Sequence, residues 1–329
     1  MTMQYYEPLS LVVEMKDDGM MVRTLVERRL GVSRKLLSRL KLTEQGITVN
    51  GQRVYTNDRV KAGDLVELRM EQERSDDILP EPMALDIVYE DRDLLIVNKP
   101  PGIVVHPTHG HYTGTLANGV VHHWQERGEA VRFRPIHRLD EDTSGLVAIA
   151  KNPYIHQQLS EQLQAGEVHK SYLAYVYNAP QIAVGTVNEP IDRDPDSPHI
   201  RIVTPEGYPS VTHYETVAAY RNGAASKIKL KLETGRTHQI RVHMKHLGCP
   251  LIGDSMYGFA SPERQAAGSP ELEAMVNRQA LHAAVLGFTH PMKREWMQWE
   301  ASLPDDLRQL EDALQQENNS MENGEIEQA

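Results

Sequence analysis

The residues with the clearest capacity for chemistry lie in one short segment, residues 137 to 151, which reads HRLDEDTSGLVAIAK. Its first half is polar and contains Arg138, Asp140 and Asp142, whose guanidinium and carboxylate groups can bind anions or take part in acid–base reactions. Its second half contains the apolar run Leu146–Ala150, which predicts a short buried strand. A loop that leads into a buried strand holds its side chains on a rigid scaffold, so the segment predicts a catalytic loop.

Two common kinds of active site do not fit this segment and its surroundings. Asp140 and Asp142 are two residues apart on one loop, so they cannot flank a glycosidic bond at the separation of roughly 5 to 9 Å that a glycosidase needs. The chain also lacks the Gly-x-Gly-x-x-Gly and Gly-Lys-Ser/Thr segments that cradle phosphates. We therefore expect neither glycoside hydrolysis nor a nucleotide cofactor.

A metal centre is a third alternative, because five histidines occur close together in the chain. Their spacing fits neither a helical pair of ligands nor the usual zinc patterns, and no carboxylate is placed to complete a set. The single cysteine, Cys249, excludes a disulfide framework and a zinc site built on thiolates. We expect no metal; the five histidines are His106, His109, His111, His122 and His123.

The composition indicates a folded chain whose charge is unevenly distributed. Its 329 residues are 40% hydrophobic, and this length predicts two domains or one large domain with an appendage. Apolar segments of the roughly 20 residues needed to span a membrane are missing, and residues 1 to 10 do not resemble a signal peptide. We therefore expect a cytoplasmic protein, and a monomer. The net charge is −11, yet residues 21 to 74 contain 12 Lys and Arg against 7 Asp and Glu.

The elements that must position the loop are strands and helices without a regular βαβ alternation. The helix after the loop is expected to begin at Pro153, a residue suited to the first helical turn. This pattern predicts an α+β fold with a mixed, largely antiparallel sheet over residues 85 to 303. The strands are expected at 87–90, 94–97, 171–177 and 227–232, and the helices at 114–127 and 153–163.

Residues 1 to 74 predict a separate small module of two helices and a sheet. Gly31 is expected to end the first helix, and Ser33 to cap the second. Asn50 and Gly51 predict a tight hairpin because both residues tolerate positive φ, and a third strand is expected at 65–70. Such a module buries little apolar surface, so we expect it to pack on its neighbour.

The two ends of the large domain have different compositions from its interior. Residues 75 to 84 are charged and interrupted by two prolines, which indicates a linker. Residues 304 to 329 contain 8 Asp and Glu against one Arg. This segment can begin as a helix but becomes too acidic and polar to pack, so we expect a disordered tail.

Several ordered blocks of the large domain resemble the RluA family of pseudouridine synthases. The segment 137–146 is similar to the family signature His-Arg-Leu-Asp-x-x-Thr-Ser-Gly-Leu, and residues 98–102 resemble its Asn-Lys-Pro-x-Gly element. The resemblance spans about residues 86 to 306. It departs at Asn178, where the family commonly has Gly, but Asn also tolerates positive φ and the turn is expected to survive. Further matching blocks begin at Lys170, Thr234, Pro250 and Gln279.

This resemblance implies a reaction and assigns roles to residues. Members of the family detach uracil from ribose, rotate it and rejoin it through a ring carbon, without a cofactor or metal. The catalytic Asp corresponds to Asp140, acting as a nucleophile or in a glycal route, and Arg236, expected on a strand, would hold it charged. Tyr172 would stack on the uracil and help remove the ring proton, and Arg138 would fill the gap left by the flipped base. Architectural roles near the site fall on Lys99, His137, Thr143, Ser144, Gly145 and His243.

The N-terminal module resembles the S-four domain, an RNA-binding module. The resemblance rests on residues 32–35 (VSRK), 46–51 (GITVNG) and 60–66 (VKAGDLV), which occur in the family's order. It implies that a basic face of this module contacts RNA. The basic residues expected to bind RNA are Arg23, Arg34, Lys35, Arg39, Lys41 and Arg53.

Together these resemblances predict an enzyme that converts specific uridines to pseudouridine in structured RNA. The expected substrate is large-subunit ribosomal RNA of the 23S type or its precursor particle. The alternative is a noncatalytic RNA-binding or ribosome-assembly factor built on a synthase fold. The presence of Arg138, Asp140, Tyr172 and Arg236 favours the enzyme.

Overall fold

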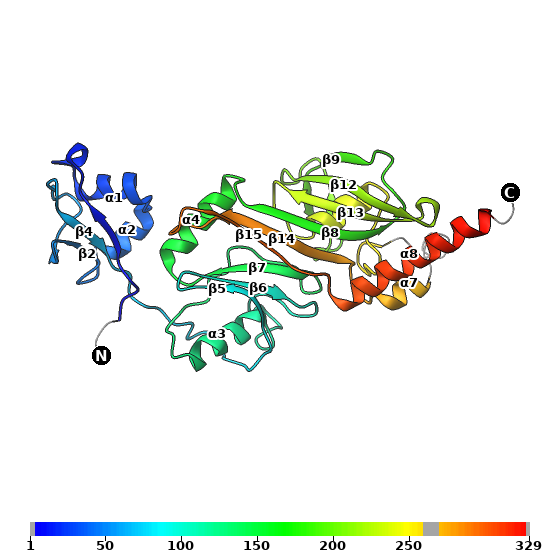
Figure 1. Ribbon diagram of the computed structural model, residues 1–329, viewed down its shortest axis with the longest axis horizontal. Helices are drawn as coiled ribbons and strands as arrows, with labels where there is room; N and C mark the ends of the chain where they lie inside the picture. Colours follow the sequence, from blue (N-terminus) through cyan, green and yellow to red (C-terminus); the bar gives the residue numbers. More distant parts are fainter. Residues whose placement is uncertain (1–3, 259–269, 327–329) are drawn as a thin grey trace.

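The computed structural model describes residues 4–258 and 270–326. A small N-terminal domain lies at one end of an elongated molecule, and a large α+β domain occupies the rest (Figure 1). The C-terminal helix extends from the end of the large domain that is opposite the N-terminal domain. The predicted α+β class is confirmed by this arrangement.

The N-terminal domain is an antiparallel sheet of four strands, in the order β1–β4–β2–β3, packed with two helices. Gly31 ends the first helix with a φ of 63°, and the Ser33 side chain accepts a hydrogen bond from the backbone N–H of Leu36, as predicted. Asn50 and Gly51 have φ of 50° and 78° and form the predicted hairpin. The elements are β1 (Leu9–Val12), the 3-10 helix η1 (Met15–Asp17), α1 (Val22–Leu30), α2 (Arg34–Leu40), β2 (Ile47–Val49), β3 (Gln52–Arg53) and β4 (Leu65–Leu68).

The N-terminal domain packs on α4 (Pro153–Gln164) of the large domain, as its small size predicted. The Tyr154 hydroxyl donates to the Leu30 carbonyl at 2.7 Å, and the Gln157 amide donates to the Gly31 carbonyl at 2.7 Å. These side chains satisfy carbonyls at the end of α1 that the helix leaves without intrahelical partners. One apolar cluster spans both domains and includes Leu25, Val32, Leu37, Ile155, Leu159 and Phe288.

The large domain is built on a sheet of nine strands in the order β5–β6–β7–β14–β8–β13–β12–β9, with β15 paired to β14. Neighbouring strands are antiparallel except β7 and β14, which are parallel. Asn178 follows β8 with a φ of 61°, so the turn survives without Gly. The strands are β5 (Asp86–Glu90), β6 (Leu94–Lys99), β7 (Ser144–Ala150), β8 (His169–Tyr177), β9 (Val184–Asn188), β12 (Val211–Tyr220), β13 (Ala225–Leu232), β14 (Leu281–Thr289) and β15 (Trp296–Glu300).

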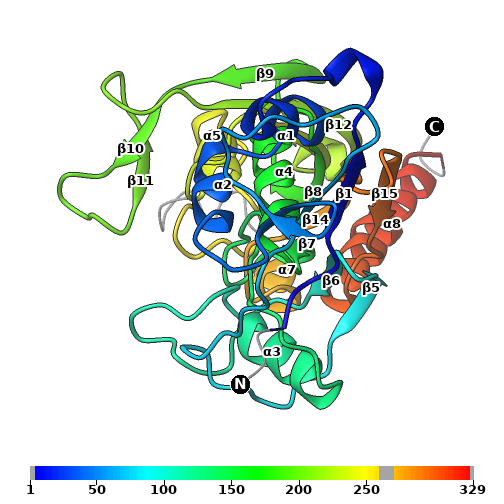
Figure 2. The same cartoon turned by 90° about the vertical axis from the view of Figure 1, so that its left-hand side faces the viewer.

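Helices cover both faces of this sheet. Along β7, Val147 and Ile149 belong to the apolar cluster that includes residues of α3 (Leu116–Glu126), whereas Leu146 and Ala148 belong to the cluster that includes residues of α4. The period of two therefore divides each strand between two apolar cores. Figure 2, viewed from the N-terminal end, shows that β10 (Ile191–Arg193) and β11 (Arg201–Val203) form a separate pair of strands that projects from the side of the domain. Further elements are the 3-10 helix η2 (Arg221–Gly223), α5 (Gln239–His246) and α7 (Pro270–Met275).

The C-terminal segment forms helix α8 (Asp305–Ile326), so the prediction of a disordered tail from residue 304 is wrong for most of its length. Leu307, Leu310 and Leu314 occur at i, i+3 and i+7, and all three are buried in one apolar cluster with Tyr175 of β8. The sequence analysis counted acidic residues and overlooked this apolar stripe. Residues 327–329 of the predicted tail lie outside the described residues.

None of the described helices combines the length and the apolar character that crossing a membrane requires.

Candidate active site

The predicted catalytic loop lines a cleft of about 730 Å³ in the large domain. The cleft brings together Arg138, Asp140, Tyr172 and Arg236, which come from three separate parts of the chain. Its volume is in the usual range of sites for small molecules and cofactors, and it can take in a single nucleotide. Other lining residues include His106, His137, Thr143, Lys170, Gly235, His238 and Arg241.

Close packing between β7 and β14 fixes the exit of the catalytic loop. The Thr143 N–H donates to the Asp140 carbonyl at 3.1 Å, which closes a turn directly after Asp140. Ser144 then contacts His282 through a 2.9 Å hydrogen bond. At Gly145 the φ is 119°, and a Cβ would lie 2.3 Å from the Ala283 carbonyl oxygen, so only glycine fits there.

Lys99 connects the loop at residues 100–103 to the predicted catalytic loop through hydrogen bonds. It is completely buried, and its ammonium donates to the carbonyls of Pro100, Ile103 and Glu141 at 2.8, 2.9 and 2.8 Å. Three carbonyl acceptors match the three hydrogens of a protonated lysine. Burial, together with the positive charge of Arg278, lowers the pKa of Lys99 to about 7.

The cation beside Asp140 is Arg241, not the predicted Arg236. One terminal nitrogen of Arg241, Nη1, lies 3.8 Å from Asp140 Oδ2. The same guanidinium donates two hydrogen bonds, of 2.7 and 2.8 Å, to the buried carboxylate of Asp254. Arg236 instead stacks 5.6 Å from the ring centroid of Tyr208 and forms no ion pair with any residue that the structure describes. The predicted pairing of Asp140 with Arg236 is therefore wrong.

Helix α5, which the sequence analysis missed, explains this error. Arg236 was expected on a strand, but it lies in an exposed loop before the helix, whereas Arg241 is in the first turns of α5 and buried. His238 enters the helix with a φ of 57°. The spacing of Ile240, Met244 and Leu247, at i, i+4 and i+7, is the helical signal that could have placed Arg241 inside.

Tyr172 and His238 line the cleft together with Asp140, and both interact electrostatically with its carboxylate. Tyr172 is buried, and burial, together with the negative charge of Asp140, raises its pKa. Burial lowers the pKa of His238, although Asp140 favours its charged form. His238 Nδ1 lies 2.8 Å from the hydroxyl of Tyr257, whose ring lies 4.8 Å from the Arg241 guanidinium. The sequence analysis did not single out His238, Tyr257 or Asp254.

The remaining predicted residues of the large domain have different surroundings. His137 is held neutral, because burial and the nearby Lys170 lower its pKa to about 3. His243 is fully buried, and its two ring nitrogens lie 2.8 Å from the Thr212 hydroxyl and 2.9 Å from the Glu189 carbonyl, which ties α5 to β12. Arg138 lines the cleft with an exposed side chain that is free to meet a ligand from solvent.

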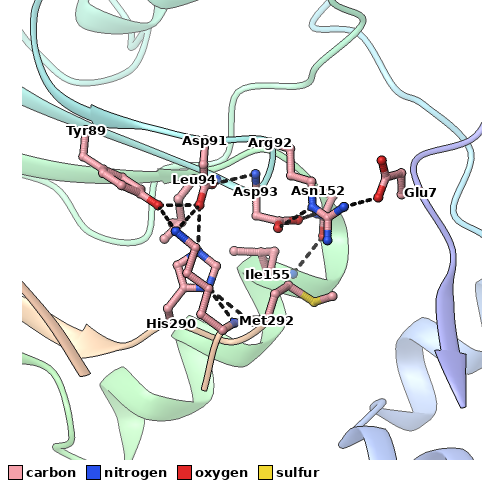
Figure 3. Close-up of polar contacts among 11 residues, drawn as sticks. Glu7, Tyr89, Asp91, Arg92, Asp93, Leu94, Asn152, Ile155, His290 and Met292 are labelled. Atoms are coloured by element: carbon pink, nitrogen blue, oxygen red, sulfur yellow. Dashed lines mark hydrogen bonds and ion pairs between the residues drawn. The ribbon is translucent and has the colours of Figure 1, made fainter. Parts of the chain in front are cut away.

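A cluster of three possible metal ligands, Asp91, Asp93 and His290, lies outside the cleft (Figure 3). Burial raises the pKa of Asp91, but hydrogen bonds from His290, Tyr89 and two backbone amides outweigh it, so the pKa is well below its ordinary value. The Asp91 carboxylate is therefore already charged and saturated with donors. Its contacts join the β5–β6 hairpin to the turn after β14.

All six basic residues predicted to bind RNA are exposed on the N-terminal domain, although three of them have protein partners, one of these being Arg34, which lies 3.9 Å from the carboxylate of Glu27. Arg39 pairs with Glu73, and Arg53 donates to the Lys41 carbonyl at 3.3 Å. The exposed side chains of Arg34 and Lys35 lie in the first turn of α2. The sixth residue, Arg23, lies near the start of α1.

Comparisons with known proteins identify the family of this chain. Residues 93–246 match the family model of RNA pseudouridylate synthase, and residues 9–66 match that of the RluD ribosomal pseudouridine synthase N-terminal domain. The chain is 38% identical to the uncharacterized RNA pseudouridine synthase YhcT of Bacillus subtilis, over 92% of this chain and 96% of that protein. It is 40% identical to the ribosomal large subunit pseudouridine synthase D of Yersinia pestis, over 84% of this chain and 86% of that protein.

Solved structures support the same assignment. The structure of human RNA pseudouridylate synthase domain containing 1 superimposes with a TM-score of 0.54 and 28% identity, covering 68% of this chain and 86% of that one. The sequence relatives extend this likeness across both domains of the chain. The chain therefore belongs to the RluA family of RNA pseudouridine synthases.

Proposed function

We propose that this enzyme isomerises specific uridines of large-subunit ribosomal RNA or its precursor particle, as a monomer in the cytoplasm. The observation that carries the proposal is the placement of Asp140 in the cleft, 29% exposed, with Arg241 Nη1 3.8 Å from its carboxylate. Several relatives of similar length are named ribosomal large subunit pseudouridine synthase D, which supports the ribosomal substrate.

In this proposal each residue around the cleft has a separate task. Asp140 attacks the nucleotide or stabilises the ribose cation, and the Arg241 guanidinium lies beside its carboxylate, with Nη1 at 3.8 Å. Tyr172 packs against the uracil as a neutral phenol. Arg138 and Arg236 have exposed guanidinium groups at the cleft, where they can contact phosphates and fill the space left by the extruded base.

The reaction itself is tested by release of tritium from precursor ribosomal RNA labelled at C5 of uridine. Formation of pseudouridine breaks the C5–H bond, so we expect tritium in the solvent in proportion to the pseudouridine formed. Pseudouridine mapping in ribosomal RNA from a strain without this protein then identifies the modified position. A protein that binds this RNA tightly and releases no tritium would be the noncatalytic assembly factor instead.

We also propose that the N-terminal domain binds the RNA backbone through its exposed basic residues. The Arg34→Gln/Lys35→Gln double variant is expected to bind RNA more weakly, because two phosphate contacts are lost. The slope of log K against log salt should become shallower by about 0.7 to 0.9 for each contact. Filter binding over a range of salt concentrations measures this slope.

The control for the salt experiment is Lys16→Gln in the same domain. Lys16 is exposed but already pairs with Glu14 at 2.8 Å, so its replacement should leave the slope unchanged. An unchanged slope in the double variant contradicts the basic-face proposal.

A further inference from the structure

Two buried cations hold the two carbonyls that follow Asp140. Lys99 donates to the Glu141 carbonyl at 2.8 Å, and Arg278 Nη1 donates to the Asp142 carbonyl at 2.9 Å. Both donors lie on segments that enter or leave the central sheet, so they are rigidly placed. The backbone of this loop is therefore held by two side chains that do not line the cleft.

The orientation of the Arg278 guanidinium depends in turn on helix α8. Its Nε and Nη2 donate to the two carboxylate oxygens of Asp306 at 2.7 and 3.0 Å, a bidentate pair that fixes the plane of the guanidinium. Asp306 lies in the first turn of α8, and its Oδ1 also accepts from the Leu307 N–H at 2.8 Å. Among the described residues Asp306 is the only carboxylate that pairs with Arg278.

We propose that Asp306 is a positioning residue of the active site and that α8 completes the site. This inference rests on the proposed catalytic role of Asp140. The chain of contacts runs from Asp306 to Arg278, then to the Asp142 carbonyl and the turn that carries the Asp140 carboxylate. Without Asp306 the plane of the guanidinium is no longer fixed, and the hydrogen bond from Arg278 to the Asp142 carbonyl is weakened. A displacement of about 1 Å is enough to lower a rate by 10²-fold.

The surroundings of Arg278 explain why the loss of the Asp306 carboxylate should affect catalysis more than folding. Arg278 Nη1 also donates to the carbonyls of Gln279 and Leu281 at 3.2 and 3.3 Å, which keep it near its site. The hydrogen bond from Lys99 to the Glu141 carbonyl is unchanged, and α8 keeps its three buried leucines. RNA affinity should also be unchanged, because Asp306 does not line the cleft.

The matched control is Asp305, the residue before Asp306 in the same helical turn. Asp305 is exposed and pairs with Arg308 on the helix surface. Replacing Asp305 by Ala therefore removes the same charge from the same end of α8 without touching Arg278. The conservative variant Asp306→Glu keeps the carboxylate and is expected to recover much of the lost rate.

The test measures single-turnover tritium release at saturating RNA, RNA affinity, and hydrogen exchange of the peptide covering residues 138–146. Asp306→Ala should lower the single-turnover rate by about 10- to 100-fold, change RNA affinity less than about twofold, and speed exchange in the peptide. Arg278→Lys, which keeps the charge but loses the bidentate geometry, should behave in the same way. Asp305→Ala should match wild type in all three measurements.

The inference is overturned if Asp306→Ala and Arg278→Lys show wild-type exchange in this peptide, or if Asp305→Ala changes exchange equally. A wild-type rate in Asp306→Ala also overturns it. Failure of the proposed function has a different signature, since then wild type itself releases no tritium. In that case the hydrogen-exchange measurement still shows whether Asp306 and Arg278 hold the loop, because exchange does not depend on turnover.

Discussion

Replacing Asp140 by Asn is expected to lower the rate of pseudouridine formation by about 10⁴-fold or more, while RNA affinity remains within a few-fold of wild type. The amide has nearly the same shape as the carboxylate, but it has no negative charge and is a poor nucleophile. The Asp140 side chain is 29% exposed and its contact with Arg241 is 3.8 Å long, so the fold should tolerate the change. Tritium release and filter binding on the same transcript measure the two quantities.

Asp142→Asn is the matched control for this experiment. Asp142 lies two residues further along the same loop, its side chain does not line the cleft, and Arg278 contacts only its backbone carbonyl. The control variant should therefore retain a rate close to that of wild type. Turnover by Asp140→Asn at the wild-type rate, or equal losses in both variants, would contradict the assignment of Asp140.

Arg241→Met should have the second largest effect, on both stability and activity. The Asp254 carboxylate is buried and would lose both hydrogen bonds from the guanidinium, so the free energy of unfolding should fall by about 3 to 5 kcal/mol. Activity should also fall at least about 100-fold, because the Asp140 carboxylate loses the cation that lies beside it in the cleft. Chemical denaturation and tritium release at a temperature where the variant is folded measure these effects.

A double variant separates the two effects of Arg241. In Arg241→Met/Asp254→Asn the buried negative charge is gone, while the Asn oxygen can still accept from the backbone amides of Met256 and Tyr257. Stability should therefore recover in part, and activity should stay low. Recovery of activity together with stability would mean that Arg241 acts only through folding.

Arg236→Met is the matched control for Arg241. Arg236 is exposed, contacts the Tyr208 ring and donates to the Pro209 carbonyl at 3.3 Å. Its loss should change the free energy of unfolding by less than about 0.5 kcal/mol. A larger loss of activity in Arg236→Met than in Arg241→Met would favour the pairing of Asp140 with Arg236 that the structure does not show.

Features that depend on neighbouring residues were predictable from the sequence. The αL position of Gly31, the cap at Ser33 and the hairpin at Asn50–Gly51 follow from backbone preferences that act within a few residues. The same is true of the apolar run after the catalytic loop, which forms β7. Helix α5 has a comparable local signal that was missed, so this error came from the interpretation of the sequence.

Pairings between distant segments could not be predicted in this way. The i, i+3, i+7 stripe of α8 is readable, but the surface that buries it includes Tyr175 of β8 and Tyr220 of β12, which are distant in the sequence. The pairs Asp140–Arg241 and Arg278–Asp306 likewise exist only because sheet order and helix packing bring their elements together. The spacing of charged residues along a chain does not determine which of them meet in space.

The sequence by itself therefore determined the local elements of the N-terminal domain, the strand that follows the predicted catalytic loop and, through the resemblance of its motifs, the family. These depend on local backbone preference, on the periodicity of apolar residues and on the order of motifs. Only the tertiary structure decided which cation lies beside Asp140 and that Asp306 of α8 is linked through Arg278 to the carbonyl of Asp142. The physical reason is that electrostatic and hydrogen-bond partners are selected by distance in the folded state, and folding places Arg241 inside and Arg236 at the surface.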